Sequence, residues 1–382
     1  MVQKMKQVFL FILATVIVVA TLQGCGRAGE HEASGEVIPM RHAQHLHLWR
    51  GEGYTIVHLQ DPWDTTRVLH AYVLVPRDSV LPSSLPQGTL VRTPCRRLGL
   101  SSSVHVALLS ELGCSSAVAG VCEPQYVLDH DIRQRVASGE VADLGRASNP
   151  SIERLMDAHP DALLLTPFAG SGGYGKAEAL GIPIIETAEY METTALGEAE
   201  WMRFYALLLG EEARGDSLFG AIEARYLSSA SAARRLAPHR ARRPRVLTEM
   251  MTSGTWYVPG GQSTIAHMIA DAGGDYVFAA RPESGSVALT FETVLSQGAE
   301  ADVWLIKYSD DTPLTLHQLS SDYAPYSRFR AFETRQVWGC NLSDNRYYTD
   351  IPFHPDRLLD ELIHIFGATD TTNTYGYYER LQ

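Results

Sequence analysis

Hydrophobic and polar residues alternate along residues 37–93 in the way that half-buried strands require. Three stretches rich in β-branched and aromatic side chains, at 44–49, 54–59 and 68–75, are separated by glycine, aspartate and proline. Alternation with a period of two places the apolar side chains on one face of a sheet, so each stretch predicts a strand. Residues 37–93 are therefore predicted to form a small β extension at the N-terminal side of the fold.

From residue 94 the pattern changes to short apolar strands that alternate with helical stretches. Strands are expected at 97–100, 117–121, 162–166 and 182–186, and helices at 104–112, 152–158 and 176–180. Strands that alternate with helices favour βαβ units and a mainly parallel sheet. Residues 94–195 are therefore predicted to form an N-terminal α/β lobe.

A long stretch of helix-forming residues follows, and the alternation then restarts. Residues 197–236 contain no proline and are rich in Ala, Leu, Glu and Arg, which predicts one long helix or a closely joined pair. Further strands are expected at 246–250, 276–278 and 303–308, and further helices at 263–272, 291–297 and 355–366. The fold class predicted is α/β, with two Rossmann-like lobes at 94–195 and 241–367, a bridging helix at 196–240 and a tail at 368–382.

The first 24 residues carry a different hydrophobic pattern. Lys4 and Lys6 precede an apolar run over 8–20, and the segment ends in Leu22-Gln23-Gly24-Cys25. The run is too short to span a bilayer and is typical of a secretory signal peptide. A cysteine after Leu-x-Gly resembles a bacterial lipobox, although an ordinary signal peptide with a chance cysteine is the alternative. The resemblance implies cleavage before Cys25, lipidation of its thiol, a tether at 25–36 and a periplasmic, membrane-anchored protein.

Charge and cysteine content narrow the picture further. From Cys25 onward, 30 Lys and Arg stand against 44 Asp and Glu, a net charge of −14. An acidic chain is a poor nucleic-acid binder, so no nucleic-acid partner is expected. The remaining cysteines form no C-x-x-C pair, so zinc and redox motifs are not indicated. Whether any disulfide joins them stays open; they are Cys95, Cys114, Cys122 and Cys340.

The middle of each lobe repeats one short pattern. Residues 151–165 and 290–306 both contain a capping residue, an apolar residue, a glutamate and then a link to aspartate and an apolar strand. The glutamates are Glu153 and Glu292. An acidic residue in the first turn suits the positive end of a helix, which is the purely structural interpretation of both.

The same stretches resemble a known family. IERLMDAHPDALLLT at 152–166 and YVPGGQSTIAHMIADAGGDYVF at 257–278 are similar to the substrate-binding lipoproteins of ABC importers for ferric siderophores, haem and cobalamin, over about residues 94–367. The resemblance implies two lobes on a rigid helical backbone, a monomer without catalytic residues, cofactor or resident metal, and docking of Glu153 and Glu292 on permease arginines. The extension at 37–93 departs from the family core and looks like an addition common in Bacteroidetes members; its role stays open.

A ligand is expected between the lobes, where loops follow the carboxyl ends of parallel strands. Side chains of these loops that suit a flat or anionic ligand are the candidate cleft residues. They are Ser102, His105, Tyr126, Phe168, Tyr174, Trp256, Tyr257, Arg281, Arg328, Arg346 and Tyr347. For His105 the alternative is an ordinary hydrogen bond at a helix start, and for Trp256 it is core packing.

Two other classes of function compete with a receptor for an iron chelate, haem or corrinoid. An exported enzyme, for example a tetrapyrrole chelatase, is one, but the chain has neither a G-x-S-x-G nor an H-E-x-x-H motif. A manganese or zinc receptor is the other, and it needs several buried histidines and acids in the cleft. Only His105 is well placed for that role.

Overall fold

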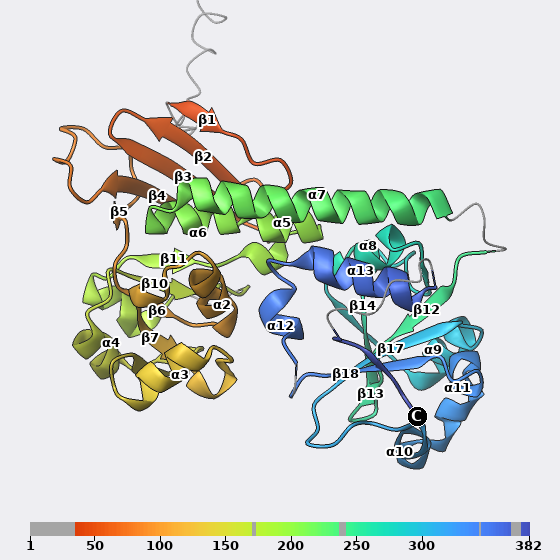
Figure 1. The fold of residues 1–382 in the computed structure, drawn as a ribbon. Coiled ribbons are helices and arrows are strands. Elements are labelled where there is room, and N and C mark those ends of the chain that lie inside the picture. Colours follow the sequence, from red (N-terminus) through yellow and green to blue (C-terminus); the bar gives the residue numbers. More distant parts are fainter. Residues whose placement is uncertain (1–34, 170–172, 237–241, 344, 368–375) are drawn as a thin grey trace, which may run out of the picture. The chain divides into compact units, whose positions relative to one another are not determined.

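The computed structural model describes residues 35–169, 173–236, 242–343, 345–367 and 376–382. The predicted signal peptide at 1–24, Cys25 and nearly all of the tether lie outside the described residues. Residues 36–382 form one compact unit, shown in Figure 1. Within the described residues no helix combines the length and the hydrophobicity needed to cross a membrane.

The β extension is a five-stranded sheet whose strands follow in chain order. They are β1 (Glu36–Ile38), β2 (Leu46–Gly51), β3 (Tyr54–Gln60), β4 (Val68–Pro76) and β5 (Thr89–Thr93). Neighbouring strands are antiparallel, except that β5 runs parallel to β4. One face of this sheet shares a single apolar cluster with the N-terminal lobe, in which Leu48, Val57 and Leu74 pack with Leu98 and Phe204. The extension is therefore part of the same core rather than a separate module.

Buried carboxylates fasten the extension to the bridging helices. Glu200 is fully buried and accepts hydrogen bonds from the main-chain N–H groups of Arg41, His42 and Ala43 at 2.7–2.9 Å. Glu192 accepts two more, from the N–H groups of residues 44 and 45. Main-chain donors that would otherwise be buried without partners are thus satisfied by charged acceptors.

The N-terminal lobe is a mainly parallel sheet covered by short helices. Its strands are β6 (Leu98–Leu100), β7 (Val118–Cys122), β8 (Ala142–Arg146), β9 (Asn149–Pro150), β10 (Ala162–Leu165) and β11 (Ile184–Glu186). Its helices are α2 (Ser103–Glu111), α3 (His130–Ala137) and α4 (Ile152–Ala158), with 3-10 turns η1 (Ser115–Ala117), η2 (Pro124–Tyr126), η3 (Gly175–Leu180) and η4 (Glu189–Met191). The strand order is β11-β10-β6-β7-β8-β9, and only β9 is antiparallel to its neighbour.

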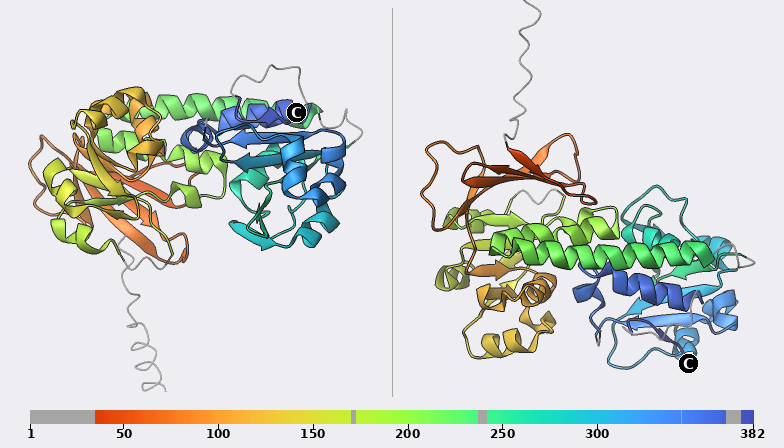
Figure 2. Two further views of the ribbon diagram at one scale, coloured as in Figure 1. Left: turned by 90° about the horizontal axis from the view of Figure 1, so that it is seen from below. Right: turned by 45° about the horizontal axis from the view of Figure 1, so that its top comes forward.

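The predicted bridge is three helices rather than one or two. They are α5 (Ala195–Glu200), α6 (Met202–Leu209) and α7 (Glu212–Leu236). Gly210 adopts a left-handed conformation at the end of α6, and the chain then enters the 25 residues of α7. Figures 1 and 2 show α7 lying along both lobes, and its residues belong to the cores of both.

The C-terminal lobe repeats this architecture and adds a small antiparallel sheet. Its main strands are β12 (Arg245–Thr248), β15 (Asp275–Tyr276), β17 (Val303–Tyr308), β18 (Val337–Asn341) and β19 (Glu379–Arg380), in the order β15-β12-β17-β18-β19. The second sheet contains β13 (Met251–Thr252), β14 (Thr255–Pro259) and β16 (Ser286–Leu289). The helices are α8 (Thr264–Asp271), α9 (Phe291–Gly298), α10 (Leu316–Asp322), α11 (Arg330–Glu333), α12 (Tyr347–Asp350) and α13 (Pro355–Ile365), with the turn η6 (Ala324–Arg328).

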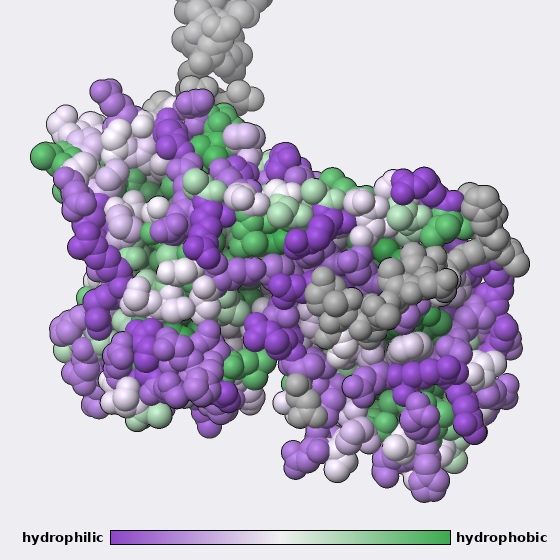
Figure 3. Space-filling view, viewed as in Figure 1, coloured by the Kyte–Doolittle hydropathy of each residue, from purple (hydrophilic) through white to green (hydrophobic). Residues whose placement is uncertain are grey.

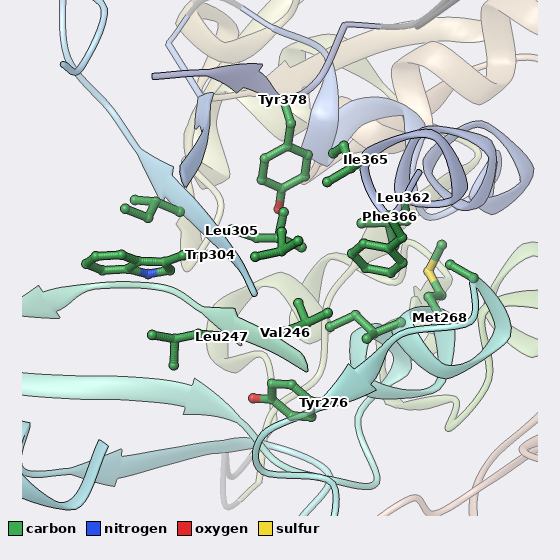
Figure 4. Close-up of a cluster of buried hydrophobic side chains, with 14 of the residues drawn as sticks. Val246, Leu247, Met268, Tyr276, Trp304, Leu305, Leu362, Ile365, Phe366 and Tyr378 are labelled. Carbon is green, nitrogen blue, oxygen red and sulfur yellow. The ribbon is translucent and has the colours of Figure 1, made fainter. Parts of the chain in front are cut away.

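The end of the chain belongs to this lobe. Strand β19 pairs with β18, and the buried rings of Tyr377 and Tyr378 join the apolar cluster drawn in Figure 4. Residues 376–382 are therefore an edge of the lobe, which corrects the prediction of a tail there; residues 368–375 lie outside the described residues. Helix α13 covers the same cluster through Leu362 and Phe366.

The two lobes share the way in which their first strands are held. In the N-terminal lobe the Arg97 N–H donates to Asp161 Oδ2 at 3.0 Å, and the Asp161 N–H donates to the Arg97 carbonyl at 2.7 Å. In the C-terminal lobe the Arg245 N–H donates to Asp302 Oδ2 at 2.9 Å, and the Asp302 N–H donates to the Arg245 carbonyl at 2.8 Å. We call these two pairs the strand latches. They make β6 equivalent to β12 and β10 equivalent to β17.

Candidate functional site

Glu153 and Glu292 occupy the same position in the two lobes. Ser151 caps α4 and Thr290 caps α9, and each hydroxyl accepts from the N–H group three residues later. Each glutamate is therefore the second residue of its helix, where the unpaired N–H groups and the helix dipole favour a negative charge. Both side chains are exposed to solvent. The structure thus brings the two predicted docking residues to equivalent exposed helix starts, one on each lobe.

A small pocket lies where the lobes meet. It has a volume of about 230 Å³ and is lined by residues of α2 from the N-terminal lobe and by residues around α12 and α13 from the C-terminal lobe. His354 Nε2 and Glu111 Oε2 lie 2.6 Å apart across this boundary. Burial raises the pKa of Glu111, but the hydrogen bond and charge of His354 outweigh it and leave the pKa below its usual value.

Arginines line the same pocket. Arg346 Nε and Arg357 Nη1 each lie 3.0 Å from a different oxygen of the buried Asp350 carboxylate. Arg346 is the one predicted cleft residue found here, and its guanidinium is half exposed. An exposed guanidinium beside an interlobe pocket can bind a carboxylate or a similar anionic group.

A larger pocket of about 700 Å³ belongs to the N-terminal lobe alone. Its walls are residues 147–152, the end of β10 and residues 173–177, and they include the predicted residues Phe168 and Tyr174. The Tyr174 hydroxyl donates to Glu186 Oε1 at 3.0 Å, and Glu186 Oε2 lies 3.4 Å from His70 Nδ1 of the extension. Its lining includes Ile152, the residue directly before Glu153, so the pocket adjoins the helix start that carries the predicted docking residue.

Other predicted cleft residues are accessible but line neither pocket. Tyr126 in η2 and Tyr257 in β14 are exposed. Ser102 is partly buried and caps α2 by accepting from the Val104 N–H at 3.2 Å. Arg281 is partly buried beside the Phe278 ring, and Arg328 is exposed at the end of η6.

His105 is buried in the interior. Its side chain is 1% exposed, its Nε2 lies 2.9 Å from Glu189 Oε1, and its ring meets those of Tyr205 and Phe353 edge-on. The expectation that it faces a ligand is corrected: it follows the alternative given above, a hydrogen bond near a helix start.

Trp256 and Tyr347 are also buried. Trp256 stacks on Trp304 in the C-terminal core and donates its indole N–H to the Thr248 carbonyl at 3.0 Å, so the expectation of a cleft wall is wrong for it. Strand alternation explains the difference, because Trp256 points inward where its neighbour Tyr257 points outward. Tyr347 is likewise covered and packs beneath the Lys307 ammonium.

Sequence reasoning missed a charged pair at the strand ends of the C-terminal lobe. Glu249 Oε1 and Lys307 Nζ lie 2.5 Å apart, and both side chains are partly accessible. Both residues fell inside predicted strands, Glu249 at 246–250 and Lys307 at 303–308, and neither carried a signal of its own. The direction of the Glu249 side chain depends on a left-handed backbone conformation that cannot be predicted from the sequence.

The described residues give no support to the manganese or zinc alternative. Among them, no three His, Cys, Asp or Glu side chains gather closely enough to hold a metal ion. The four described cysteines are free thiols, which resolves the open question of disulfides for these residues. Burial raises the pKa of Cys95 and of Cys122 to about 12, so neither is a reactive thiolate at neutral pH.

Comparisons with known proteins agree with this architecture. A family model described as periplasmic binding protein matches residues 105–341. An uncharacterised lipoprotein of Methanocaldococcus jannaschii is 26% identical over 265 residues, which are 67% of this chain and 61% of that protein. The match thus spans less than two thirds of the relative's length.

Solved structures show the same fold at low sequence identity. The apo form of the periplasmic haem-binding protein RhuT from Roseiflexus sp. RS-1 superposes with a TM-score of 0.55 at 20% identity, over 72% of this chain and 99% of that one. The siderophore-binding protein FhuD from Vibrio cholerae, bound to Fe3+-Desferal, gives a TM-score of 0.53 at 14% identity, over 71% and 98%. Two latched α/β lobes on a helical backbone, matched by the family model over most of their length, show that this chain belongs to the periplasmic binding protein family.

Proposed function

We propose that this protein is a lipid-anchored receptor outside the cytoplasm that delivers a ferric siderophore, haem or a corrinoid to the permease of an ABC importer. Cys25 supplies the anchor, and the chain acts as a monomer that binds its cargo without chemical conversion. The similar haem-binding protein and the similar siderophore-binding protein in complex with Fe3+-Desferal support this class of cargo, and the lipoprotein relative supports the anchor. A receptor anchored in this way stays concentrated beside its importer.

The observation that carries the proposal is the equivalence of Glu153 and Glu292. Both are exposed second residues of helices that lead into the latched strands β10 and β17. A helix start can hold a carboxylate without a partner on its own surface, and neither glutamate has a partner among the described contacts that would occupy it. Two such charges on two lobes suit a permease that presents two arginines.

The proposed ligand surface is reduced from the original set. Tyr126, Phe168 and Tyr174 with Ser102 remain for the N-terminal lobe, and Tyr257, Arg281 and Arg346 remain for the C-terminal lobe. Phenol and phenyl faces suit a flat or aromatic chelate, and guanidinium groups suit its anionic substituents. Arg328 stays a weaker candidate because nothing brings it to the other residues.

The test is the double variant Glu153→Ala with Glu292→Ala. We expect uptake to fall to background, since both docking charges are lost, while ligand affinity stays within about two-fold because the side chains lie outside both pockets. The matched control is Asp157→Ala with Glu300→Ala, which removes one exposed charge from the last turn of α4 and one from the loop that follows α9. The control should transport normally. Loss of ligand affinity in the docking variant, or normal uptake by it, would refute the assignment.

A further inference from the structure

The two lobes share the strand latches, but they differ at the carboxyl end of their first strands, β6 and β12. The Ser101 N–H donates to the Leu164 carbonyl at 3.1 Å, and the Glu249 N–H donates to the Leu305 carbonyl at 2.7 Å. Ser101 and Glu249 therefore occupy the same place after the first strand of each lobe. In the N-terminal lobe the chain turns directly into α2. In the C-terminal lobe it presents a carboxylate and enters the β13–β14 hairpin.

Glu249 is held in a strained conformation. Its φ of 64° lies in the left-handed region, which is unfavourable for a residue other than glycine. Two tryptophans fix it there: Trp304 donates its indole N–H to the Glu249 carbonyl at 2.7 Å, and Trp256 donates to the preceding carbonyl of Thr248 at 3.0 Å. These two hydrogen bonds to main-chain carbonyls hold Glu249 in its strained conformation. Residues held in this way are common at functional sites.

The Glu249 carboxylate forms an ion pair with Lys307. Its Nζ lies 2.5 Å from Glu249 Oε1 and 5.6 Å from the centre of the Tyr347 ring. Burial lowers the pKa of Lys307, but Tyr347 and Glu249 outweigh it and hold the pKa above its usual value, so the ammonium stays charged. About one sixth of each charged side chain remains exposed. The equivalent position of the N-terminal lobe holds the uncharged Thr166.

The choice of lysine is itself unusual for this chain. Lys4 and Lys6 belong to the predicted signal peptide, and Lys176 and Lys307 are the only other lysines; every other basic residue of the Lys and Arg set is an arginine. Lys176 is exposed on η3. Lys307 is therefore the one lysine that the fold places at a strand end, against a carboxylate and an aromatic ring.

A second cation lies in the same neighbourhood. Glu249, Lys307 and Arg281 all lie near enough to Tyr276 to influence the pKa of its hydroxyl. The Arg281 Nε is buried, and no described residue accepts a hydrogen bond from it. Glu249 and Lys307 lie at the carboxyl ends of β12 and β17, where parallel sheets bind their ligands, and Arg281 follows the neighbouring strand β15. The buried Glu361, which lies near Cys340 as Lys307 does, is occupied by the N–H groups of Tyr377 and Tyr378.

We propose that Lys307 and Arg281 bind an anionic oxygen group of the cargo, a carboxylate or a catecholate, and that Glu249 positions the Lys307 ammonium for this contact. This inference rests on the proposed function, because it names the chemical class of the cargo. The C-terminal lobe supplies the charge that selects the cargo, and the exposed tyrosines supply apolar contact. Chelates without an anionic group gain nothing from these side chains.

The experiment measures affinity by tryptophan fluorescence in the full-length protein in detergent. The anionic probes are haemin, which carries carboxylates, and a ferric tris-catecholate, which carries a net negative charge; ferric desferrioxamine and other ferric trihydroxamates with neither a free carboxylate nor a net negative charge are the matched probes without such anionic groups. The variants are Lys307→Met, Glu249→Gln and, as the control, Arg243→Met, which removes an exposed cation from the opposite end of β12. We expect Lys307→Met to weaken binding of the anionic probe at least ten-fold, because a charge-assisted hydrogen bond is lost. Glu249→Gln keeps an oxygen that accepts from Lys307 and so still positions it, while it removes a competing negative charge, and it should therefore keep or strengthen that binding. Arg243→Met should leave the binding unchanged.

The outcomes separate this inference from the function on which it rests. A ten-fold loss confined to Lys307→Met supports the anionic site, and the probe affected tells carboxylate from catecholate. An anionic probe that binds Lys307→Met as tightly as the parent protein overturns the inference alone, as does binding of only the probes without anionic groups. If Lys307→Met does not fold, a five-fold or greater loss of anionic-probe affinity in Glu249→Gln overturns it. Binding of no probe at all contradicts the proposed function as well.

Discussion

The N-terminal and C-terminal lobes share the same arrangement of central strands, but each lobe carries additional elements that the other lacks. Both have a strand latch, a capped helix with glutamate in its second position and four central strands in the same order. The N-terminal lobe then gains the β extension, which shares its core, and the C-terminal lobe gains the β13–β14–β16 sheet and the Glu249–Lys307 pair. Figure 3 shows hydrophilic side chains over most of the visible face of both lobes.

Under the proposed function, this difference separates two kinds of residue. Features that recur in both lobes would serve needs that both lobes share, namely the alignment of strands and the proposed contact with one permease. Features found in one lobe alone would serve that lobe's own partner or ligand. Glu153 and Glu292 belong to the first kind, whereas Glu249 and Lys307 belong to the second.

The largest effect is expected where the extension meets the bridge. Glu200→Ala leaves the N–H groups of residues 41–43 buried without an acceptor, which should lower the free energy of unfolding by about 3–5 kcal/mol. Glu212, which pairs with Arg50 of the same extension at the surface, is the matched control, and Glu212→Ala should cost less than about 1 kcal/mol. Urea denaturation measures both, and hydrogen exchange shows which lobe is affected.

The comparison of the two lobes predicts which parts of the protein lose protection from hydrogen exchange in Glu200→Ala. Exchange should rise in the extension and in the N-terminal lobe, because they share a core, and remain low in the C-terminal lobe. Equal loss of protection in both lobes would show that the extension braces the whole molecule rather than one half.

A smaller and more symmetrical effect is expected at the strand latches. Asp161→Asn and Asp302→Asn should each lower the free energy of unfolding by about 1–3 kcal/mol, since each carboxylate holds the first strand of its lobe. If the two variants lower the free energy of unfolding by amounts that differ by more than about 2 kcal/mol, the two strand latches are not equivalent.

The Asp302 latch also predicts a pH dependence. Burial raises the pKa of Asp302, but hydrogen bonds from Arg242 and from the Arg245 N–H outweigh it, so the folded-state pKa lies below 3.8. Its stabilising effect is therefore present above that pH and is lost as the pH falls through the lower folded value. The loss of stability on acidification below 3.8 should be smaller in Asp302→Asn than in the parent protein.

Many of the strands and helices of both lobes could be predicted, because they follow from local patterns of apolar and capping residues. The period of the apolar residues predicts β10, β17, α4 and α9, and the capping residues alone predict that Glu153 and Glu292 stand at helix starts. Helix α12 was not predicted, because four residues carry too little periodicity to distinguish a helix turn from a loop.

The strand ends could not be predicted in the same way. His105 and Trp256 looked like ligand contacts because loops after parallel strands usually are, yet Glu189 and the Trp304 ring bury them. Glu249 looked like an ordinary acid, because its left-handed backbone is held by two indoles, that of Trp256 in the following hairpin and that of Trp304, which lies 55 residues further along the chain. Such contacts are set by tertiary packing, which the local sequence does not record.

The central claim is that the two lobes together hold a metal chelate, haem or corrinoid. Visible absorption and titration calorimetry of the purified protein with haemin, cyanocobalamin and ferric hydroxamate and catecholate siderophores test it most directly. We predict saturable binding of at least one of these compounds, with a shift in its visible spectrum or a measurable heat of binding. Absence of binding to all of them would contradict the claim.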